Sequence, residues 1–106
     1  MAKYLLKANY TIEGAKGVSK EGGSGRVAAA RAAIEGLGGK LETFYFAFGS
    51  HDAFLIMDLP DNVAASALAL RVNQAGGAQV ETVVLMTAEE VDRAAKMGVT
   101  YRKPGD

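Results

Sequence analysis

The chain has 106 residues, of which 49% are hydrophobic and 23% charged, with no cysteine and one histidine. This length suits a single domain with one core. Twelve basic residues balance twelve acidic ones, so no long-range field favours nucleic acid or an anionic membrane as a partner. The absence of cysteine excludes disulfides, thiolate catalysis and cysteine-ligated zinc, and we expect a cytoplasmic protein.

The amino-terminal segment has only two consecutive leucines before the next charge, too few for the apolar region of a signal peptide. No apolar run approaches the length of about 20 residues that spans a bilayer. We therefore expect neither secretion nor insertion into a membrane.

The first half of the chain predicts a strand, an irregular segment and a helix. Tyr4 to Tyr10 alternate in the manner of a strand, and residues 11–14 form a turn. Residues 15–25 are rich in Gly, Lys and Ser, with three glycines in 22–25, which predicts a mobile or irregular entry into a helix. The helix is predicted over residues 26–37, where the residues at helical spacing are Val27, Ala30, Ile34 and Leu37. Gly38-Gly39 supplies its left-handed cap.

A β-hairpin is predicted from strands at residues 41–48 and 53–59, which meet at the polar break Gly49-Ser50-His51-Asp52. Both strands are apolar at odd and even positions, so the hairpin must bury both of its faces. The face turned away from the helices would carry one of two sets. These are either Phe44, Phe46 and Phe48 or Leu41, Tyr45 and Ala47.

The second half predicts a helix, a strand and a short final helix. Asp61 or Asn62 caps the first of these, which runs to about Gln74 and is closed by Gly76-Gly77. A fourth strand covers residues 79–86. Thr87 and Glu90 match a capping box, so a third helix should run to about Met97.

The order β-α-β-β-α-β is that of the ferredoxin-like α+β arrangement. It predicts an antiparallel four-stranded sheet with both main helices on one face and an extra C-terminal helix. We expect one domain over residues 1–97 and a tail over 98–106. Since the helices cover only one face, a second copy is expected on the other, in a homodimer or a higher homo-oligomer.

Several short segments also resemble the GYD domain family, in the same order as in that family. They are Lys3-Tyr4-Leu5, Tyr10 to Gly14, Leu37 to Tyr45, Phe48 to Asp52, Pro60-Asp61, Glu81-Thr82 and Thr87 to Glu90. The chain departs from the family in the hairpin turn, where His51 stands in place of the tyrosine of the Gly-x-Tyr-Asp signature. The resemblance implies a small bacterial or archaeal protein with a ferredoxin-like, dimeric α+β barrel-type fold. It implies no reaction.

Four residues are candidates for a ligand-binding or catalytic site. His51 and Asp52 could act together in proton transfer, since His titrates near neutral pH and a carboxylate could orient it. Alternatively, Asp52 closes the turn through backbone hydrogen bonds and His51 lies at the rim. Tyr10 and Tyr45 could supply phenols to a pocket between sheet and helices, or could be core or interface residues.

Other sites are weaker candidates. Residues 22–26 precede a helix and could hold an anion, but a flexible helix entry capped by Ser24 explains them better. One histidine and scattered carboxylates predict no metal site. We also expect no cofactor.

Two functions fit these observations. The first is a small homo-oligomeric protein that binds a small molecule in a binding or regulatory role. The second is a cofactor-independent enzyme, a monooxygenase or isomerase acting on a hydrophobic small molecule, with His51 and Tyr10 as its polar groups. The enzyme requires an enclosed apolar cavity that holds one of these two side chains. The residues that either leave such a cavity or permit tight packing are Ala30, Ala33, Ala64 and Ala67.

Overall fold

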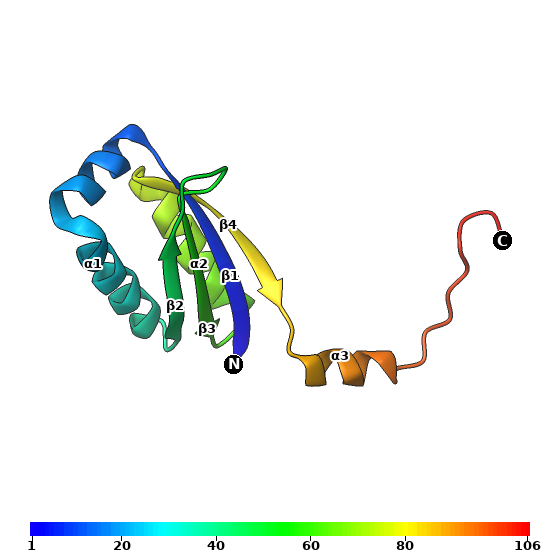
Figure 1. Ribbon diagram of the computed structural model, residues 1–106. Coiled ribbons are helices and arrows are strands. Elements are labelled where there is room, and N and C mark those ends of the chain that lie inside the picture. The colour runs from blue at the N-terminus through cyan, green and yellow to red at the C-terminus, as the bar shows by residue number, and fades with distance from the viewer.

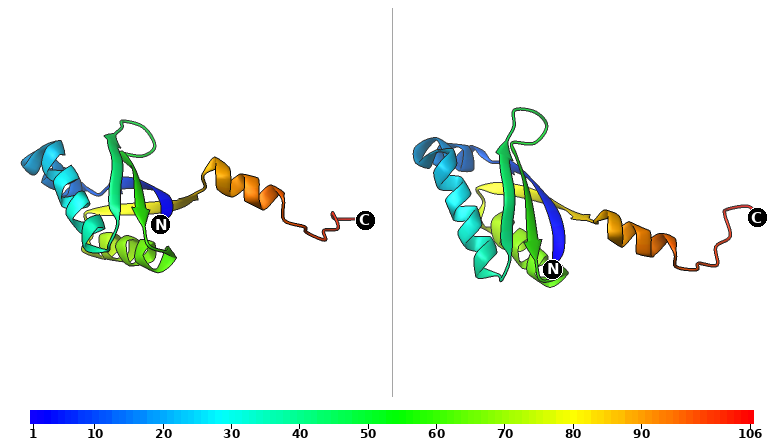
Figure 2. Two further views of the ribbon diagram at one scale, coloured as in Figure 1. Left: turned by 90° about the horizontal axis from the view of Figure 1, so that it is seen from below. Right: turned by 60° about the horizontal axis from the view of Figure 1, so that its bottom comes forward.

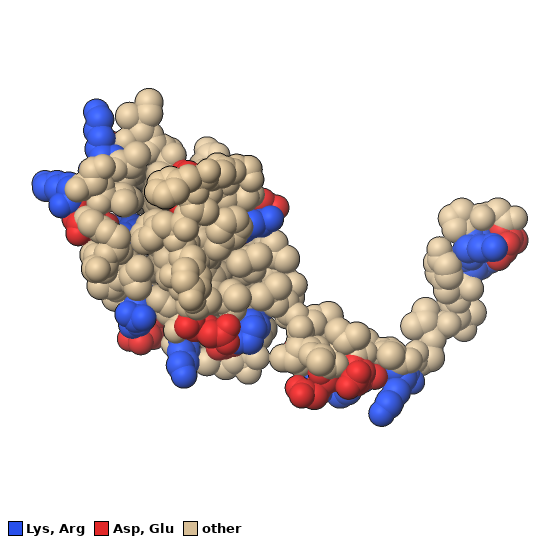
Figure 3. All heavy atoms as spheres, viewed as in Figure 1, with Lys and Arg blue, Asp and Glu red and all other residues tan.

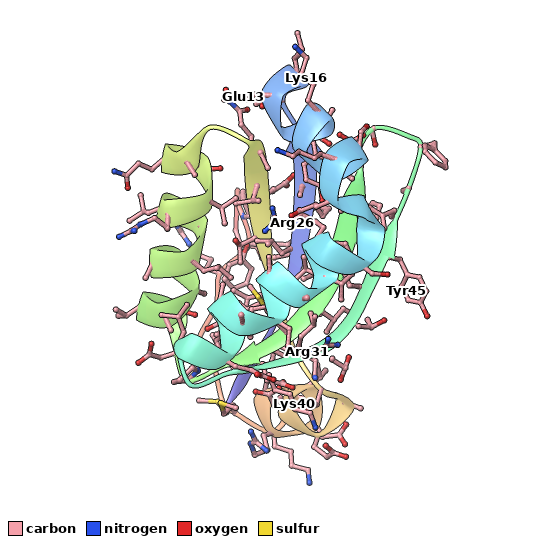
Figure 4. All side chains as sticks on the ribbon, turned by 90° about the vertical axis from the view of Figure 1, so that its left-hand side faces the viewer. Glu13, Lys16, Arg26, Arg31, Lys40 and Tyr45 are labelled. Carbon is pink, nitrogen blue, oxygen red and sulfur yellow. The ribbon has the colours of Figure 1, made fainter.

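The computed structural model describes all residues 1–106. Four strands and three helices follow one another along the chain (Figure 1): β1 (Ala2–Tyr10), α1 (Ile12–Gly36), β2 (Lys40–Phe46), β3 (Ala53–Leu59), α2 (Asn62–Ala75), β4 (Ala78–Leu85) and α3 (Ala88–Ala95). The sheet has the order β2-β3-β1-β4, and all neighbours are antiparallel. Helices α1 and α2 lie side by side over one face of it (Figure 4). The fold is the predicted ferredoxin-like arrangement.

The core lies between this face and the two helices. Alternate residues of β1 and β3 point into it, as the period of a strand requires, and α1 and α2 supply the apolar side chains above them. Tyr4 is almost wholly buried, and its hydroxyl donates a hydrogen bond of 2.6 Å to Asn62 Oδ1. Asp61 caps α2 by accepting from the Ala64 amide, which confirms the predicted start of this helix.

The hairpin carries neither of the two side-chain sets predicted for its outer face. The register shifts between Leu41 and Thr43, so Leu41 pairs with Met57 and Phe44 pairs with Leu55. Both partners are buried in the core. A β-bulge inserts one residue and thereby reverses the alternation beyond it. The first predicted set is therefore wrong, and of the second set Leu41 is a core residue.

Helix α1 starts fourteen residues before the predicted position 26, so the predicted turn at 11–14 and the irregular segment at 15–25 are wrong. Thr11 caps the helix by accepting from the Gly14 amide. Thr11 also donates through its amide and its hydroxyl to the carbonyls of Gly77 and Gly76, which anchors the first turn to the α2–β4 connection. This contact requires Gly14, because a Cβ there would lie 1.7 Å from the Gly77 oxygen. The irregularity is confined to Gly22, where φ is +79° and ψ is 168°.

Helix α3 begins with the predicted capping box. The Glu90 amide donates to Thr87 Oγ1, and the Thr87 amide donates to Glu90 Oε1. The helix extends from the end of β4 on the side of the molecule opposite α1 (Figures 1 and 2), and none of its residues is buried. It ends at Ala95, two residues before the predicted end. None of the three helices combines the length and apolar character needed to cross a membrane.

The other face of the sheet, here called the open face, has no helix over it. Its central row runs across three strands as Ile56, Leu5 and Val83, which are neighbours in register. An ion pair flanks this row on each side: Lys3 Nζ lies 3.0 Å from Asp58, and Lys7 Nζ lies 3.8 Å from Glu81. The remaining apolar side chains of the open face are Tyr45, Phe54 and Leu85.

Candidate functional site

A cavity of about 210 Å³ lies between the sheet and the two helices, and we call it the sheet–helix cavity. Fourteen of its 17 lining residues are hydrophobic. Strands β1, β3 and β4 form its floor, and α1 and α2 form its walls. The lining includes Ala8, Tyr10, Arg26, Ala29, Ala30, Ala33, Phe44 and Ala75.

Small side chains leave this space open. Ala29, Ala30 and Ala33 of α1 lie on its wall, and Ala75 of α2 faces them. Each alanine presents only a methyl group, which fills less of the space over the sheet than the side chain of Ile34 on the same helix. Of the four alanines considered above, Ala30 and Ala33 line the cavity, whereas Ala64 and Ala67 do not.

Tyr10 and Asp52 meet at one end of the cavity. The Tyr10 amide donates to Asp52 Oδ2 over 2.9 Å. The Asp52 amide in turn donates to the Ala8 carbonyl, and its carbonyl accepts from Ala47. Asp52 therefore joins the hairpin turn to the end of β1 and fixes the backbone of Tyr10, which matches the structural interpretation of this residue.

The phenol of Tyr10 stays protonated over the ordinary pH range. Burial raises the pKa of Tyr10 above its usual value. The negative charges of Asp52 and Glu21 raise this pKa as well, and the positive charge of Arg26 opposes them. A protonated phenol can donate a hydrogen bond to a ligand in the cavity.

Arg26 is the one charged residue in the lining of the cavity. It lies on α1 beyond the Gly22 break, and Figure 4 places it in the space between α1 and α2. Its Nη1 is 3.4 Å from Glu21 Oε1. The sequence held a signal for this position, because Arg26 precedes Ala30 by four residues and Ala33 by seven and so falls on the same helical face.

A second, more open groove of about 410 Å³ shares Tyr10 with the cavity. The first half of α1 forms one side through Ala15 and Val18, and the hairpin forms the other through Phe46 and Phe48. Tyr10 thus borders both spaces, with the groove on the solvent side.

His51 and Tyr45 lie apart from the cavity. The His51 ring packs edge-on against Phe54 of the open face, with ring centroids 5.7 Å apart. Tyr45 is the register partner of Phe54 and is 71% exposed at the outer strand β2 (Figure 4). His51 and Asp52 form no ion pair with each other. The four predicted residues therefore fall into two groups, Tyr10 with Asp52 at the cavity and His51 with Tyr45 on the open face.

No group of three or more His, Cys, Asp or Glu side chains is arranged to hold a metal ion. The donors at the cavity are instead a phenol and a guanidinium, both of which present hydrogens. This chemistry suits an organic molecule with an acceptor group better than a cation.

The sequence matches the model of one protein family, the GYD domain, over residues 4–95. This stretch runs from the first strand through α3 and includes every residue placed at the cavity. No curated protein and no solved structure matches the chain. Because the family match covers most of the chain, the protein belongs to the GYD domain family.

Proposed function

We propose that this protein binds a small, predominantly apolar molecule in the sheet–helix cavity, as a homo-oligomer and in a binding or regulatory role. The observation that carries the proposal is the cavity, about 210 Å³ in volume and lined mainly by hydrophobic side chains. Protein interiors are otherwise packed as densely as organic crystals. An apolar cavity of about 150 Å³ is enough to bind benzene. A molecule with a single ring or a short branched chain matches the volume here.

Filling the cavity tests this proposal. Ala30→Leu places a larger side chain in the lining, whereas Ala28→Leu on the same helix faces solvent and serves as the control. In an NMR titration of the whole chain with benzene, we expect shifts at the amides of Ala8, Tyr10 and Ala30. The affinity should fall at least about tenfold in Ala30→Leu and stay unchanged in Ala28→Leu.

The stability of the same variant is a second measurement. In a solid core an added Leu costs about 1–3 kcal/mol through overpacking. In an open cavity Ala30→Leu should leave the free energy of unfolding equal to that of the wild type, or raise it. Absence of benzene shifts in the wild type, or equal binding by Ala30→Leu and the wild type, would contradict the proposal.

A cofactor-independent enzyme is the second candidate, and the position of Tyr10 favours it. This phenol borders the cavity and remains protonated, so it could donate a proton to a bound molecule. His51 does not line the cavity and has no part in this candidate. The enzyme requires that Tyr10→Phe retain the affinity for a bound compound and abolish its turnover. Retained turnover in that variant would exclude this mechanism.

A second copy of the chain is the proposed partner of the open face. The apolar row of this face lies between two ion pairs. In a two-fold dimer the same patch of each copy meets its counterpart, so the apolar rows would form the centre of the interface and the ion pairs its rim. Helix α3 adds support, because it has no buried residue and carries its charged side chains along one side (Figure 3). Its uncharged side is free to pack on another surface.

A further inference from the structure

Arg26 is a charged residue in a wall of the cavity that is otherwise apolar, and close packing of that wall does not require a charge. The lining around it is apolar, and the neighbouring positions on the same helical face are Ala30 and Ala33. The Arg26 side chain is 39% exposed, so it borders the cavity and the solvent at once. None of the five N–H donors of Arg26 makes a hydrogen bond within the chain, so the guanidinium has capacity for a further acceptor.

The ion pair with Glu21 does not satisfy this guanidinium. It is a single contact of 3.4 Å, and the two side chains are 39% and 40% exposed. Exposed single-contact pairs of this kind contribute little to stability. The side chain of Glu21 can therefore rotate away into the solvent when another anion reaches Arg26.

Tyr10 supplies the second donor at the same end of the cavity. It lines the cavity together with Arg26, and its phenol keeps its proton. Asp52 is close to Tyr10, but one of its carboxylate oxygens is already occupied by the Tyr10 amide. The groups that line the cavity itself are thus donors, whereas the carboxylates of Glu21 and Asp52 lie outside its lining.

We infer that the ligand of the sheet–helix cavity is a small monocarboxylic acid, whose carboxylate binds Arg26 and Tyr10 and whose apolar body fills the cavity. This inference rests on the proposed function and adds the chemical class of the ligand. A carboxylate matches the planar guanidinium with two parallel hydrogen bonds. The volume of about 210 Å³ is suited to an acid with one ring.

The test compares three probes that share one ring and differ in charge. Benzoate is the acid, benzyl alcohol is neutral and benzylamine is the cation. In NMR titrations of the whole chain at pH 7, we expect benzoate to bind at least about tenfold more tightly than benzyl alcohol, and benzylamine to bind most weakly.

Substitution of Arg26 assigns the preference to this residue. Arg26→Met keeps the length of the side chain and removes its charge, so benzoate should lose at least about tenfold in affinity while benzyl alcohol changes by less than about twofold. Arg31→Met is the matched control, because Arg31 is exposed on the same helix and outside the cavity (Figure 4). Arg26→Lys, which retains the charge, should keep part of the preference and also serves if Arg26→Met does not fold.

Each contrary result has a separate meaning. Equal affinities for benzoate and benzyl alcohol, or tightest binding of benzylamine, would overturn the acid inference and leave the cavity as a binding site. A preference for benzoate that is undiminished in Arg26→Met would overturn the assignment to Arg26, whatever the result for Arg31→Met. If no probe shifts the amides around the cavity, the proposed function fails as well.

Discussion

The buried phenol of Tyr10 should make the protein less stable at alkaline pH. Its folded-state pKa is raised above the ordinary value of about 10, chiefly by burial. A raised pKa means that the phenol contributes stability in full below pH 10 and loses this contribution as the pH rises through the folded-state value. We expect the free energy of unfolding to fall above pH 10, and to fall less steeply in Tyr10→Phe.

Denaturant unfolding between pH 8 and pH 11 measures this effect. Tyr45→Phe is the control, since Tyr45 is 71% exposed and its phenol meets water in both states. The difference between wild type and Tyr10→Phe should grow with pH, whereas Tyr45→Phe should follow the wild type. Parallel curves for the wild type and Tyr10→Phe would show that burial of this phenol has no energetic consequence.

At the scale of single residues, the sequence predicted two of the residues near the cavity, Tyr10 and Asp52, and placed His51 and Tyr45 there incorrectly. Tyr10 lies at the cavity because strand alternation places it on the same face of β1 as the core residues Tyr4 and Leu6. His51 and Asp52 were paired by adjacency, but the turn directs them to different surroundings. Arg26 was missed as a cavity residue because the helix was predicted to begin there, which made it part of the entry and not of the buried stripe.

At the scale of elements, the prediction succeeded where capping residues and Gly pairs mark the ends. Asp61 and Thr87 start their helices as expected. The first half of α1 could not be predicted, because its many glycines lower helix propensity and its anchor is a tertiary contact with residues 76–77. The bulge after Leu41 was equally hidden, since Phe44, Tyr45 and Phe46 are all apolar and so do not show which of them faces the core.

Two glycines of α1 should respond in opposite ways to alanine. Gly22 has φ +79° and ψ 168°, a conformation almost restricted to glycine, so Gly22→Ala should cost about 1–3 kcal/mol of stability. Gly17 lies within the helix with open space around its Cα, so Gly17→Ala should add up to about 1 kcal/mol. Thermal or urea unfolding of both variants checks the difference. Stabilisation by both substitutions would mean that α1 runs straight through residue 22.

At the scale of the whole molecule, the second copy proposed for the open face would also account for α3. The sequence predicted an aromatic outer face, but Phe44 and Phe46 belong to the helix-covered side and the open face has a shorter apolar row. Helix α3 is eight residues long and none of its residues is buried in its own chain. Isolated helices of this length are marginal in water. A second copy that covers both surfaces would remove the exposed apolar area and give α3 a support.

A charge at the centre of the open face should separate the two copies. Ile56 lies in the middle of the apolar row, and Ile56→Asp would bury an unpaired carboxylate in the interface, at a cost of about 3–5 kcal/mol. Sedimentation at micromolar concentration should give at least twice the chain mass of 11.1 kDa for the wild type and a single chain for Ile56→Asp. Gln79→Asp, at an exposed edge of the sheet, should remain associated. Circular dichroism separates dissociation from unfolding in Ile56→Asp, and a wild type that sediments as one chain would exclude the interface on this face.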